Sequence, residues 1–493
     1  MTLDGRQLGA SAKSAILWSG GFTLLRDVLQ FLAMLVLVRL LSPEDYGSAA
    51  LAQSIIGFIA VFSFGTFILH ALQVRDPAEI DWQAHFTAAV FINLMLFVLT
   101  LLIAWGLSFS ATYHSAALPL AVLATLLIVE IPGTLRHRML ETRHDWKRFR
   151  ILVGIGTALA LFVGVAIALM GGGVWALVVQ PPLFGLPAAI DLFLNEKWRP
   201  NWSWSWARYR EAAGFGLNRM GSTAVIRARQ AVEQGYLTST YDFATLGVFT
   251  RAQGLATLIA GRIGRVATTT LYPILTRAEE QSDQFQHMAG MVLRGVSWTT
   301  MPAAVFLALA ADDLVSLLYG PKWESVASLL PYGTAVLALG GITATLTNLL
   351  LANKQSNTSL AIDLISAAVA VGVAVVFIPF GLEIYLMALA VQSLLVLFIA
   401  IFYLHRTHGV TRISLNWAFI PPVISCMIAT LAMQQLTMRG AVLHYLSLNL
   451  LLNAIVFSFF YLITLRIAFP IRMKELLQVV PGGSLMQAWL FIY

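Results

Sequence analysis

The fold is decided by residues 213–269, which read AGFGLNRMGSTAVIRARQAVEQGYLTSTYDFATLGVFTRAQGLATLIAGRIGRVATT. This largely apolar stretch carries six arginines, and most of the chain around it has the composition of bilayer-spanning helices. An arginine at mid-depth in a bilayer is costly unless it faces protein or water. We therefore expect two spanning helices with inward-facing arginines, namely Arg219, Arg227, Arg229, Arg251, Arg262 and Arg265.

Helical periodicity groups some of these arginines. At about 100° per residue, Arg251, Arg262 and Arg265 fall on one helix face. Arg229 lies four residues before Glu233, which is the spacing of an intrahelical ion pair. Two interpretations stay open. The arginines either line a cavity that attracts anions, or they pair with carboxylates and carbonyls between helices or extend to the membrane interface.

Composition indicates a polytopic membrane protein, because 58% of the residues are hydrophobic and only 11% are charged. The net charge of +7 would suggest a nucleic-acid partner in a soluble chain. Here the basic residues lie in short loops between apolar segments, so membrane topology explains them and we expect no nucleic-acid partner. The single cysteine, Cys426, excludes an intrachain disulfide. The chain has no metal-ligand pattern and no phosphate-binding loop, so we expect no metal, no cofactor and no direct use of ATP.

Fourteen apolar segments are long enough to cross about 30 Å of hydrocarbon. The first carries Arg26 beside Asp27, which fits either a polar face on a cavity or an ion pair between helices. The fourth contains Glu130 before Pro132, which fits either a proton or cation site or a buried hydrogen-bonded acid. Glu130 and Glu233 are the candidate residues for coupling to H⁺ or Na⁺. The expected segments are about 15–41, 47–72, 86–107, 117–135, 151–170, 174–194, 213–238, 244–271, 296–318, 327–352, 359–379, 384–404, 417–436 and 443–465.

The distribution of basic residues predicts the orientation. The expected outer loops hold only Arg39, Lys322 and Arg439, so both termini are expected in the cytoplasm. Basic residues interleaved with tryptophans over 195–212 indicate an interfacial linker between two halves. The expected organisation is an N-terminal tail at 1–14, an N-lobe of six helices at 15–194, the linker at 195–212, a C-lobe of six helices at 213–407, two additional helices at 408–466, and a cytoplasmic tail at 467–493.

An internal repeat relates the two halves. Aligning Gly47 with Gly247 places Ala52 and Gln53 on Ala252 and Gln253, and it sets Arg26 almost opposite Arg227. Six spans precede the linker and six follow it, so both copies enter the membrane from the same side. Parallel repeats of this kind imply two lobes related by an axis along the membrane normal, with a shared central cavity. The expected fold class is therefore an all-α polytopic membrane protein with two six-helix lobes, related by a pseudo-two-fold repeat, plus two C-terminal helices.

Four stretches form a set of motifs in a fixed order. They are RLLSPEDYG (39–47), FGLN (215–218), TLGVFTRA (245–252), and LYP (271–273) with YGPKW (319–323). Together they resemble the polysaccharide transporter branch of the multidrug/oligosaccharidyl-lipid/polysaccharide flippase superfamily. One departure is the segment 241–246, where the family commonly has a glycine-rich sequence.

The resemblance implies a transporter and not an enzyme. Such a flippase moves undecaprenyl-pyrophosphate-linked oligosaccharide, of the exopolysaccharide, capsule or O-antigen type, across a bacterial inner membrane by alternating access. The implied partners are the lipid-linked substrate, the bilayer and other polysaccharide assembly proteins, and we expect a monomer. Arginines bind phosphate oxygens bidentately. We therefore expect Arg26, Arg219, Arg227, Arg229, Arg251, Arg262 and Arg265 to bind the head group, while the prenyl tail stays in lipid between the lobes.

Three alternatives stay open at this point. An ion-coupled multidrug exporter of the same fold would need acidic rather than arginine-lined walls. A flippase for the lipid-linked peptidoglycan precursor would solve a similar chemical problem. A membrane glycan polymerase or ligase would display a large outer loop with catalytic residues, whereas every expected outer loop here is short.

Overall fold

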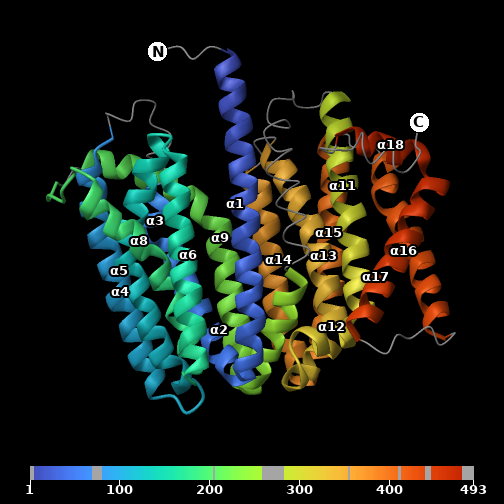
Figure 1. The fold of residues 1–493 in the computed structure, drawn as a ribbon, viewed down its shortest axis with the longest axis horizontal. Coiled ribbons are helices and arrows are strands. Elements are labelled where there is room, and N and C mark those ends of the chain that lie inside the picture. The colour runs from blue at the N-terminus through green and yellow to red at the C-terminus, as the bar shows by residue number, and fades with distance from the viewer. Residues whose placement is uncertain are drawn as a thin grey trace. The chain divides into compact units, whose positions relative to one another are not determined.

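The computed structural model describes residues 5–68, 80–203, 206–257, 283–352, 356–408, 412–438 and 446–479. Within these ranges every regular element is a helix (Figure 1). Twelve of the described helical segments are long and apolar enough to cross a membrane. The chain is therefore a multi-pass membrane protein. Its residues form two compact units, Met1–Gly247 and Val248–Tyr493.

The described part of the first unit is built from helices. They are α1 (Gly5–Leu40), α2 (Pro43–Ile59), the 3₁₀ helix η1 (Ala60–Phe62), α3 (Phe64–Phe67), α4 (Trp82–Ser108), α5 (His114–Thr142), α6 (Trp146–Leu169), α7 (Trp175–Val178), α8 (Gln180–Asn195) and α9 (Trp206–Thr240). A helix over residues 243–257 follows α9 and crosses into the second unit.

The described part of the second unit is also built from helices. They are α11 (Asp283–Leu309), α12 (Ala311–Leu318), the 3₁₀ helix η4 (Pro321–Trp323), α13 (Glu324–Ala352), α14 (Ser356–Phe377), the 3₁₀ helix η5 (Ile378–Phe380), α15 (Leu382–His408), α16 (Arg412–Met438), α17 (Leu446–Ala468) and α18 (Pro470–Val479).

Twelve of the fourteen expected spans coincide with the membrane-spanning helices found in the described residues. The other two are the arginine-bearing pair. The first of these lies on α9, which begins at Trp206, inside the expected linker, and continues without interruption to Thr240. The second is helical over 243–257, and its remainder lies outside the described residues. The lobe boundary at 195–212 stays a prediction beside the division after Gly247.

Helix α5 is central to the first unit, where it packs against α2, α4 and α8. Its residues Leu120, Leu123 and Leu127 are fully buried. Large apolar side chains cover the opposite, outward faces of the bundle, such as Phe162 on α6 and Trp105 on α4. In a bilayer such faces contact lipid. Packing and internal hydrogen bonds therefore decide which helix faces pack against one another more than hydrophobicity does.

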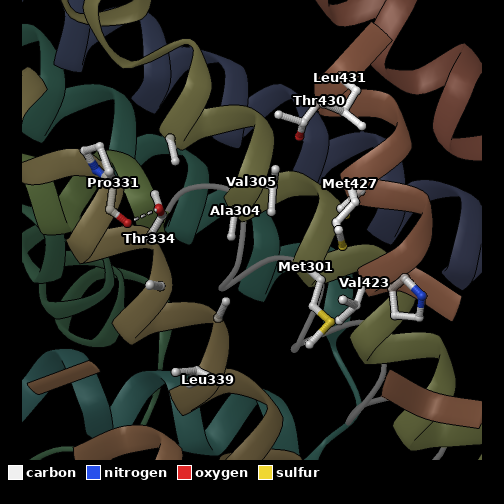
Figure 2. A pocket seen from close by; sticks show the side chains of 15 residues that line it. Met301, Ala304, Val305, Pro331, Thr334, Leu339, Val423, Met427, Thr430 and Leu431 are labelled. Atoms are coloured by element: carbon white, nitrogen blue, oxygen red, sulfur yellow. Dashed lines mark hydrogen bonds between the residues drawn. The ribbon is translucent and has the colours of Figure 1, made fainter. Parts of the chain in front are cut away.

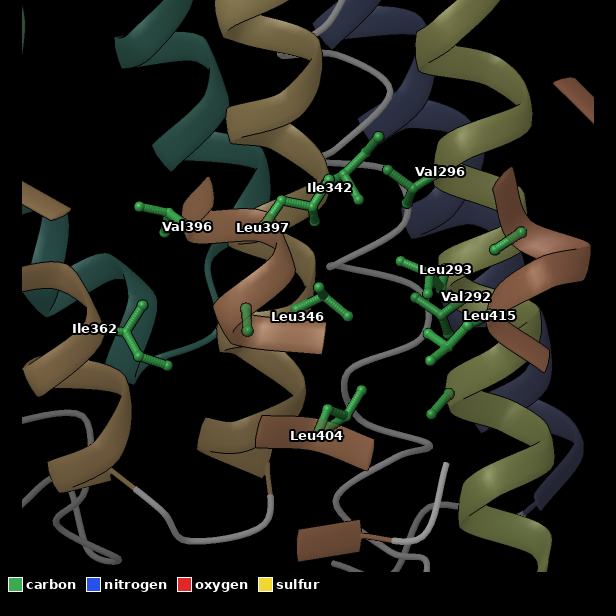
Figure 3. Close-up of a cluster of buried hydrophobic side chains, with 13 residues drawn as sticks. Val292, Leu293, Val296, Ile342, Leu346, Ile362, Val396, Leu397, Leu404 and Leu415 are labelled. Carbon is green, nitrogen blue, oxygen red and sulfur yellow. The ribbon is translucent and has the colours of Figure 1, made fainter. Parts of the chain in front are cut away.

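The core of the second unit joins α11, α13, α15 and α16 (Figure 3). Val292 and Val296 of α11 face Ile342 and Leu346 of α13 across this core, and Leu397 of α15 completes it. Branched side chains in fixed rotamers fill such an interior at close-packed density. The core therefore holds these helices as one bundle.

Two turns begin the repeat-related helices in the same way. Ser42 caps α2, because its Oγ accepts a hydrogen bond from the Asp45 backbone N at 3.2 Å and its own backbone N donates to Asp45 Oδ2 at 3.0 Å. The Asp242 side chain accepts from the Thr245 backbone N at 2.7 Å at the start of the helix over 243–257. Ser42 and Asp242 are 200 positions apart, which is the offset of the internal repeat.

A cluster of charged side chains ties three helices of the first unit together. Arg136 of α5 is buried, and it donates from Nε to Asp191 Oδ2 and from Nη1 to Glu196 Oε2, each at 2.6 Å. Arg148 of α6 donates to Asp191 Oδ1 at 2.7 Å, and Arg143 donates to Glu196 Oε2 at 2.7 Å. We call these five residues the Arg136 cluster. Burial raises the pKa of Glu196, but hydrogen bonds and charge from Arg143 and Arg136 outweigh burial and hold that pKa below its usual value.

A second charged cluster anchors the short helix α18. Glu475 accepts a hydrogen bond from buried Arg294 of α11 at 2.6 Å and another from Arg472 at 2.7 Å. The Arg472 guanidinium lies 5.0 Å from the ring centroid of Trp417 on α16. Burial raises the pKa of Glu475, but the two arginines outweigh burial and hold that pKa below its ordinary 4.5.

Candidate functional site

Arg26 lies on α1 beside its expected counter-charge. Its Nη2 is 3.6 Å from Asp27 Oδ1, and both side chains are partly exposed, at 32% and 18%. The Arg26 Nε is buried and makes no hydrogen bond within the described residues. A long, partly exposed ion pair leaves much of the guanidinium available to a stronger anion.

The two α9 arginines differ in how their charge is balanced. Arg229 donates to Glu233 Oε2 at 2.9 Å, and Glu233 is buried, so the predicted intrahelical pair is confirmed. Arg227 is exposed and donates to the neutral amide oxygen of Gln230 at 3.1 Å. Within the described residues no carboxylate pairs with Arg227. The charge of Arg227 therefore remains uncompensated, whereas that of Arg229 is balanced.

Arg251 lies on the helix over residues 243–257 and is half-buried. Its guanidinium carbon would lie 3.7 Å from a Cβ on Gly254, so the side chain runs along its own helix toward the next turn. Its charge acts on Tyr319, a buried residue at the end of α12. Burial raises the pKa of Tyr319, and the positive charge of Arg251 opposes this effect.

Three of the seven expected arginines receive no side-chain description. Arg219 lies on α9, but its side chain is outside the described part. Arg262 and Arg265 lie in the segment 258–282, outside the described residues. The shared face of Arg251, Arg262 and Arg265 therefore stays a prediction.

Glu130 of α5 faces a break in a neighbouring helix. The helix that begins at Pro43 is interrupted at Ser63, between η1 and α3. The Ser63 hydroxyl donates to Glu130 Oε1 at 3.5 Å, and a Cβ on Gly65 would overlap that oxygen. Fully buried Asn93 accepts from the Phe64 backbone N and donates to the Leu127 carbonyl, each at 2.9 Å. A carboxylate is thus held against unwound backbone, which is a common setting for ion sites in transporters.

Within the described residues Glu130 forms no ion pair with an arginine, lysine or histidine. Its environment therefore differs from that of Glu233, whose carboxylate is matched by Arg229. In a low-dielectric site an unmatched carboxylate either carries a proton or attracts a cation. Of the two acids named from the sequence, Glu233 is paired with an arginine, and Glu130 is not paired with a basic side chain within the described residues.

An apolar pocket of about 570 Å³ lies in the second unit between α11, α13 and α16 (Figure 2). Met301 and Val305 of α11 point into it, as do Val423 and Met427 of α16. The Thr334 hydroxyl of α13 donates to the Pro331 carbonyl at 2.8 Å, so this polar group is satisfied. The remaining lining residues are Ala304, Ala308, Ala335, Ala338, Leu339, Pro422, Cys426, Thr430 and Leu431. Such a pocket suits a hydrocarbon chain.

The pocket did not follow from the sequence. The signal was the set of small residues spaced by three or four positions on each helix, such as Ala304 with Ala308 and Ala335 with Ala338. This spacing also describes any close helix contact. Only the packing of three separate helices distinguishes a pocket from a contact.

No group of three or more His, Cys, Asp or Glu side chains in the described part of the chain is arranged to hold a metal ion. The described site residues offer guanidinium groups, of which that of Arg227 has no carboxylate partner there, together with the Glu130 carboxylate and an apolar pocket.

Two known proteins are similar to this chain in sequence. The succinoglycan biosynthesis transport protein ExoT of Rhizobium meliloti (strain 1021) is 22% identical over 302 residues. An uncharacterized membrane protein in the cps region of Klebsiella pneumoniae is 20% identical over 315 residues. These matches cover 60% and 62% of this chain, and they span only 60% and 64% of the relatives.

Solved structures show the same fold. The lipid II flippase MurJ in an inward closed conformation superposes with a TM-score of 0.74 at 14% identity, covering 92% of this chain and 99% of that structure. An inward-facing multidrug resistance transporter of the MATE family superposes with a TM-score of 0.62 at 15% identity, covering 78% and 94%. The predicted all-α polytopic fold is therefore confirmed.

A family model described as polysaccharide biosynthesis protein matches residues 36–328, which is more than half of the chain. The matched range includes the RLLSPEDYG turn, α9, the broken helix and Arg251. One of the two relatives is named as a transport protein, and the two solved structures are of a flippase and a multidrug resistance transporter. With its fold and this match in agreement, the chain belongs to the polysaccharide biosynthesis protein family.

Proposed function

We propose that the protein is a flippase for undecaprenyl-pyrophosphate-linked oligosaccharides in a bacterial inner membrane, with both termini in the cytoplasm. The observation that carries the proposal is the family match over residues 36–328, in a chain with many membrane-spanning helices. Family membership supports a glycan cargo, and the arginines support an anionic carrier. We take the cargo to be lipid-linked, because a long prenyl chain can stay in the membrane while the head group crosses it.

The arginines divide into two groups under this proposal. Arg227 and Arg251 bind the pyrophosphate head group, with Arg26 as a further ligand at the α1 ion pair. Arg229 instead holds Glu233 in place, because its charge is already matched. Arg219, Arg262 and Arg265 remain proposed ligands on sequence grounds. A pyrophosphate that loses its hydration shell needs donors that each form two hydrogen bonds to it, and guanidinium groups are such donors.

The apolar pocket gives the prenyl chain a place on the protein. Its lining is hydrocarbon and thioether, and several lining residues, Met427 and Leu431 among them, are exposed on the outer face of the bundle. A chain in lipid can therefore enter from the side without crossing a polar surface. This proposal revises the expectation that the tail stays wholly in lipid.

Glu130 is the proposed coupling residue. Loading a proton or cation there removes an uncompensated charge beside the Ser63 break, which changes how α2 and α3 pack on α5. Binding at this site would thus favour one arrangement of the helices over another.

The test removes charge in matched pairs. Arg227→Gln with Arg251→Gln removes two proposed head-group ligands, and Lys147→Gln with Arg143→Gln removes two exposed charges at the cytoplasmic end of the first unit. Surface glycan, protein level and the position of lipid-linked glycan in inverted vesicles are measured for each. We expect lipid-linked glycan to accumulate on the cytoplasmic face only in the first double variant.

The outcomes separate the two parts of the proposal. Full surface glycan from the Arg227 and Arg251 double variant, at normal protein level, refutes the head-group assignment. Deletion of the whole protein without any accumulation of lipid-linked glycan on the cytoplasmic face refutes the flippase function itself.

A further inference from the structure

The turns that begin α2 and the helix over 243–257 are equivalent in local geometry. In each, a side chain at the first position caps the backbone N three residues on, Ser42 for Asp45 and Asp242 for Thr245. In each, the first backbone carbonyl accepts from the fifth residue, at 3.3 Å for Tyr46 and 3.2 Å for Leu246. The sequence repeat is therefore preserved as a structural repeat at these two turns.

These two turns also contact each other, and the contact is reciprocal. A Cβ built on Gly47 would overlap the Phe243 carbonyl, lying 2.6 Å from its carbon. A Cβ built on Gly247 would overlap the Pro43 carbonyl, lying 2.7 Å from its carbon and 3.1 Å from the Gly47 backbone N. Pro43 corresponds to Phe243 and Gly47 to Gly247 at the repeat offset of 200. Each turn thus touches the other with the same atoms, as a two-fold axis requires.

The contact is made by backbone, with no side chain between the two glycines and the carbonyls they approach. Helices that meet through small residues approach closely and do not interlock. They can separate without changes of side-chain rotamer. A contact built from interdigitated side chains would have to repack first.

Electrostatics keeps this contact from being strongly adhesive. Both partners are helix N-termini, which carry partial positive charge, so their approach is mutually unfavourable. Asp45 and Asp242 lie in the capping positions and offset that repulsion. The two turns are thus closely fitted yet weakly attracted, which is the property of a contact that forms and breaks.

We propose that the Gly47–Gly247 contact is a closure that must form and open during each transport cycle, at the end of the helices opposite the cytoplasmic termini. This role rests on the proposed flippase function and its orientation. Its physical core is independent of the cargo: any side chain at either glycine holds the two turns apart.

The test adds one methyl group at a time. Gly47→Ala and Gly247→Ala are compared with Gly57→Ala, because Gly57 lies on the same helix α2 and a Cβ there meets nothing within 4 Å. Leu246→Cys serves as the reporter, since Leu246 is fully buried beside the contact, in a background where Cys426→Ser removes the native thiol. A membrane-impermeant maleimide applied to whole cells measures opening. Surface glycan measures transport.

We expect Gly47→Ala and Gly247→Ala to raise the labelling rate of the reporter about tenfold or more and to reduce surface glycan, while Gly57→Ala changes neither. Labelling and glycan output equal to those of Gly57→Ala, at equal protein level, overturn the proposal. Faster labelling with unchanged glycan output also overturns it, because closure would then be dispensable.

A second measurement keeps the native glycines, in case an alanine variant fails to accumulate. Labelling of the Leu246→Cys reporter is compared in cells that make lipid-linked glycan and in cells that lack the first sugar transfer. A labelling rate that depends on the substrate supports opening during transport, and an identical rate in both strains overturns it. If deletion of the whole protein causes no accumulation of lipid-linked glycan on the cytoplasmic face, the flippase assignment fails, whereas the labelling of Gly47→Ala against Gly57→Ala still tests the contact.

Discussion

Replacing Arg136 by methionine tests whether buried charge holds the first unit together. Methionine keeps much of the length and apolar character of the side chain while removing its charge. Asp191 would keep its hydrogen bond from Arg148 at 2.7 Å, and Glu196 would keep its bond from Arg143 at 2.7 Å. Each carboxylate would lose a 2.6 Å partner that is itself buried.

The expected magnitude follows from burial. Removing one partner of a buried ion pair costs about 3–5 kcal/mol, because the remaining charge stays desolvated. Arg143→Met removes the same chemistry from a side chain that is 49% exposed, where a pair contributes about 0–1 kcal/mol. At about 2–4 °C for each kcal/mol, Arg136→Met lowers the Tm by about 6–20 °C and Arg143→Met by less than about 4 °C.

The assay is thermal unfolding of the purified protein in detergent, followed by loss of the monodisperse species. All variants are heated at one rate, because unfolding of such proteins is irreversible and the apparent Tm depends on rate. Equal shifts for Arg136→Met and Arg143→Met would refute the reasoning, since burial would then not govern the cost. Rescue of Arg136→Met by a second change, Asp191→Asn, would support it further.

Three further outcomes are expected. Glu475→Gln lowers the Tm at neutral pH by about 2–4 °C. The difference in Tm shrinks as the pH falls below about 4.5, because a carboxyl whose pKa is depressed in the folded state stabilises the fold only while it is ionised. A series of unfolding scans at different pH values measures this difference. Ala304→Phe narrows the apolar pocket and reduces surface glycan several-fold, whereas Val391→Phe on the lipid-facing side of α15 leaves surface glycan unchanged. Equal export from both variants would show that the prenyl chain stays in lipid and does not occupy the pocket. Glu130→Gln abolishes the dependence of glycan export on the imposed ion gradient in vesicles, and retained dependence would remove Glu130 from coupling.

The spanning helices were largely predictable, because runs of apolar residues of bilayer length have few alternatives in lipid. Their ends were less so. The fourth span was expected at 117–135, but α5 runs from His114 to Thr142, since a helix continues through polar residues that hydropathy excludes. The same effect let α9 begin at Trp206, inside the expected interfacial linker.

Local pairing within the candidate site could be predicted and distant pairing could not. The spacing of Arg229 and Glu233 indicated their ion pair, which is confirmed at 2.9 Å. Arg136 lies one residue beyond the expected fourth span at 117–135, yet it is buried against two carboxylates more than 50 positions away. Periodicity describes one helix at a time, so it carries no information on which side chains of another helix will contact it.

The reciprocal glycine contact has a consequence for protein engineering. Each glycine is constrained by the backbone of the other repeat copy, so the freedom of one half to vary at this position is governed by the other half. A chimera that takes its first half from one relative and its second half from another would combine two turns that are not complementary to each other. Such hybrids should be joined so that both turns come from a single parent, whatever the origin of the remaining helices.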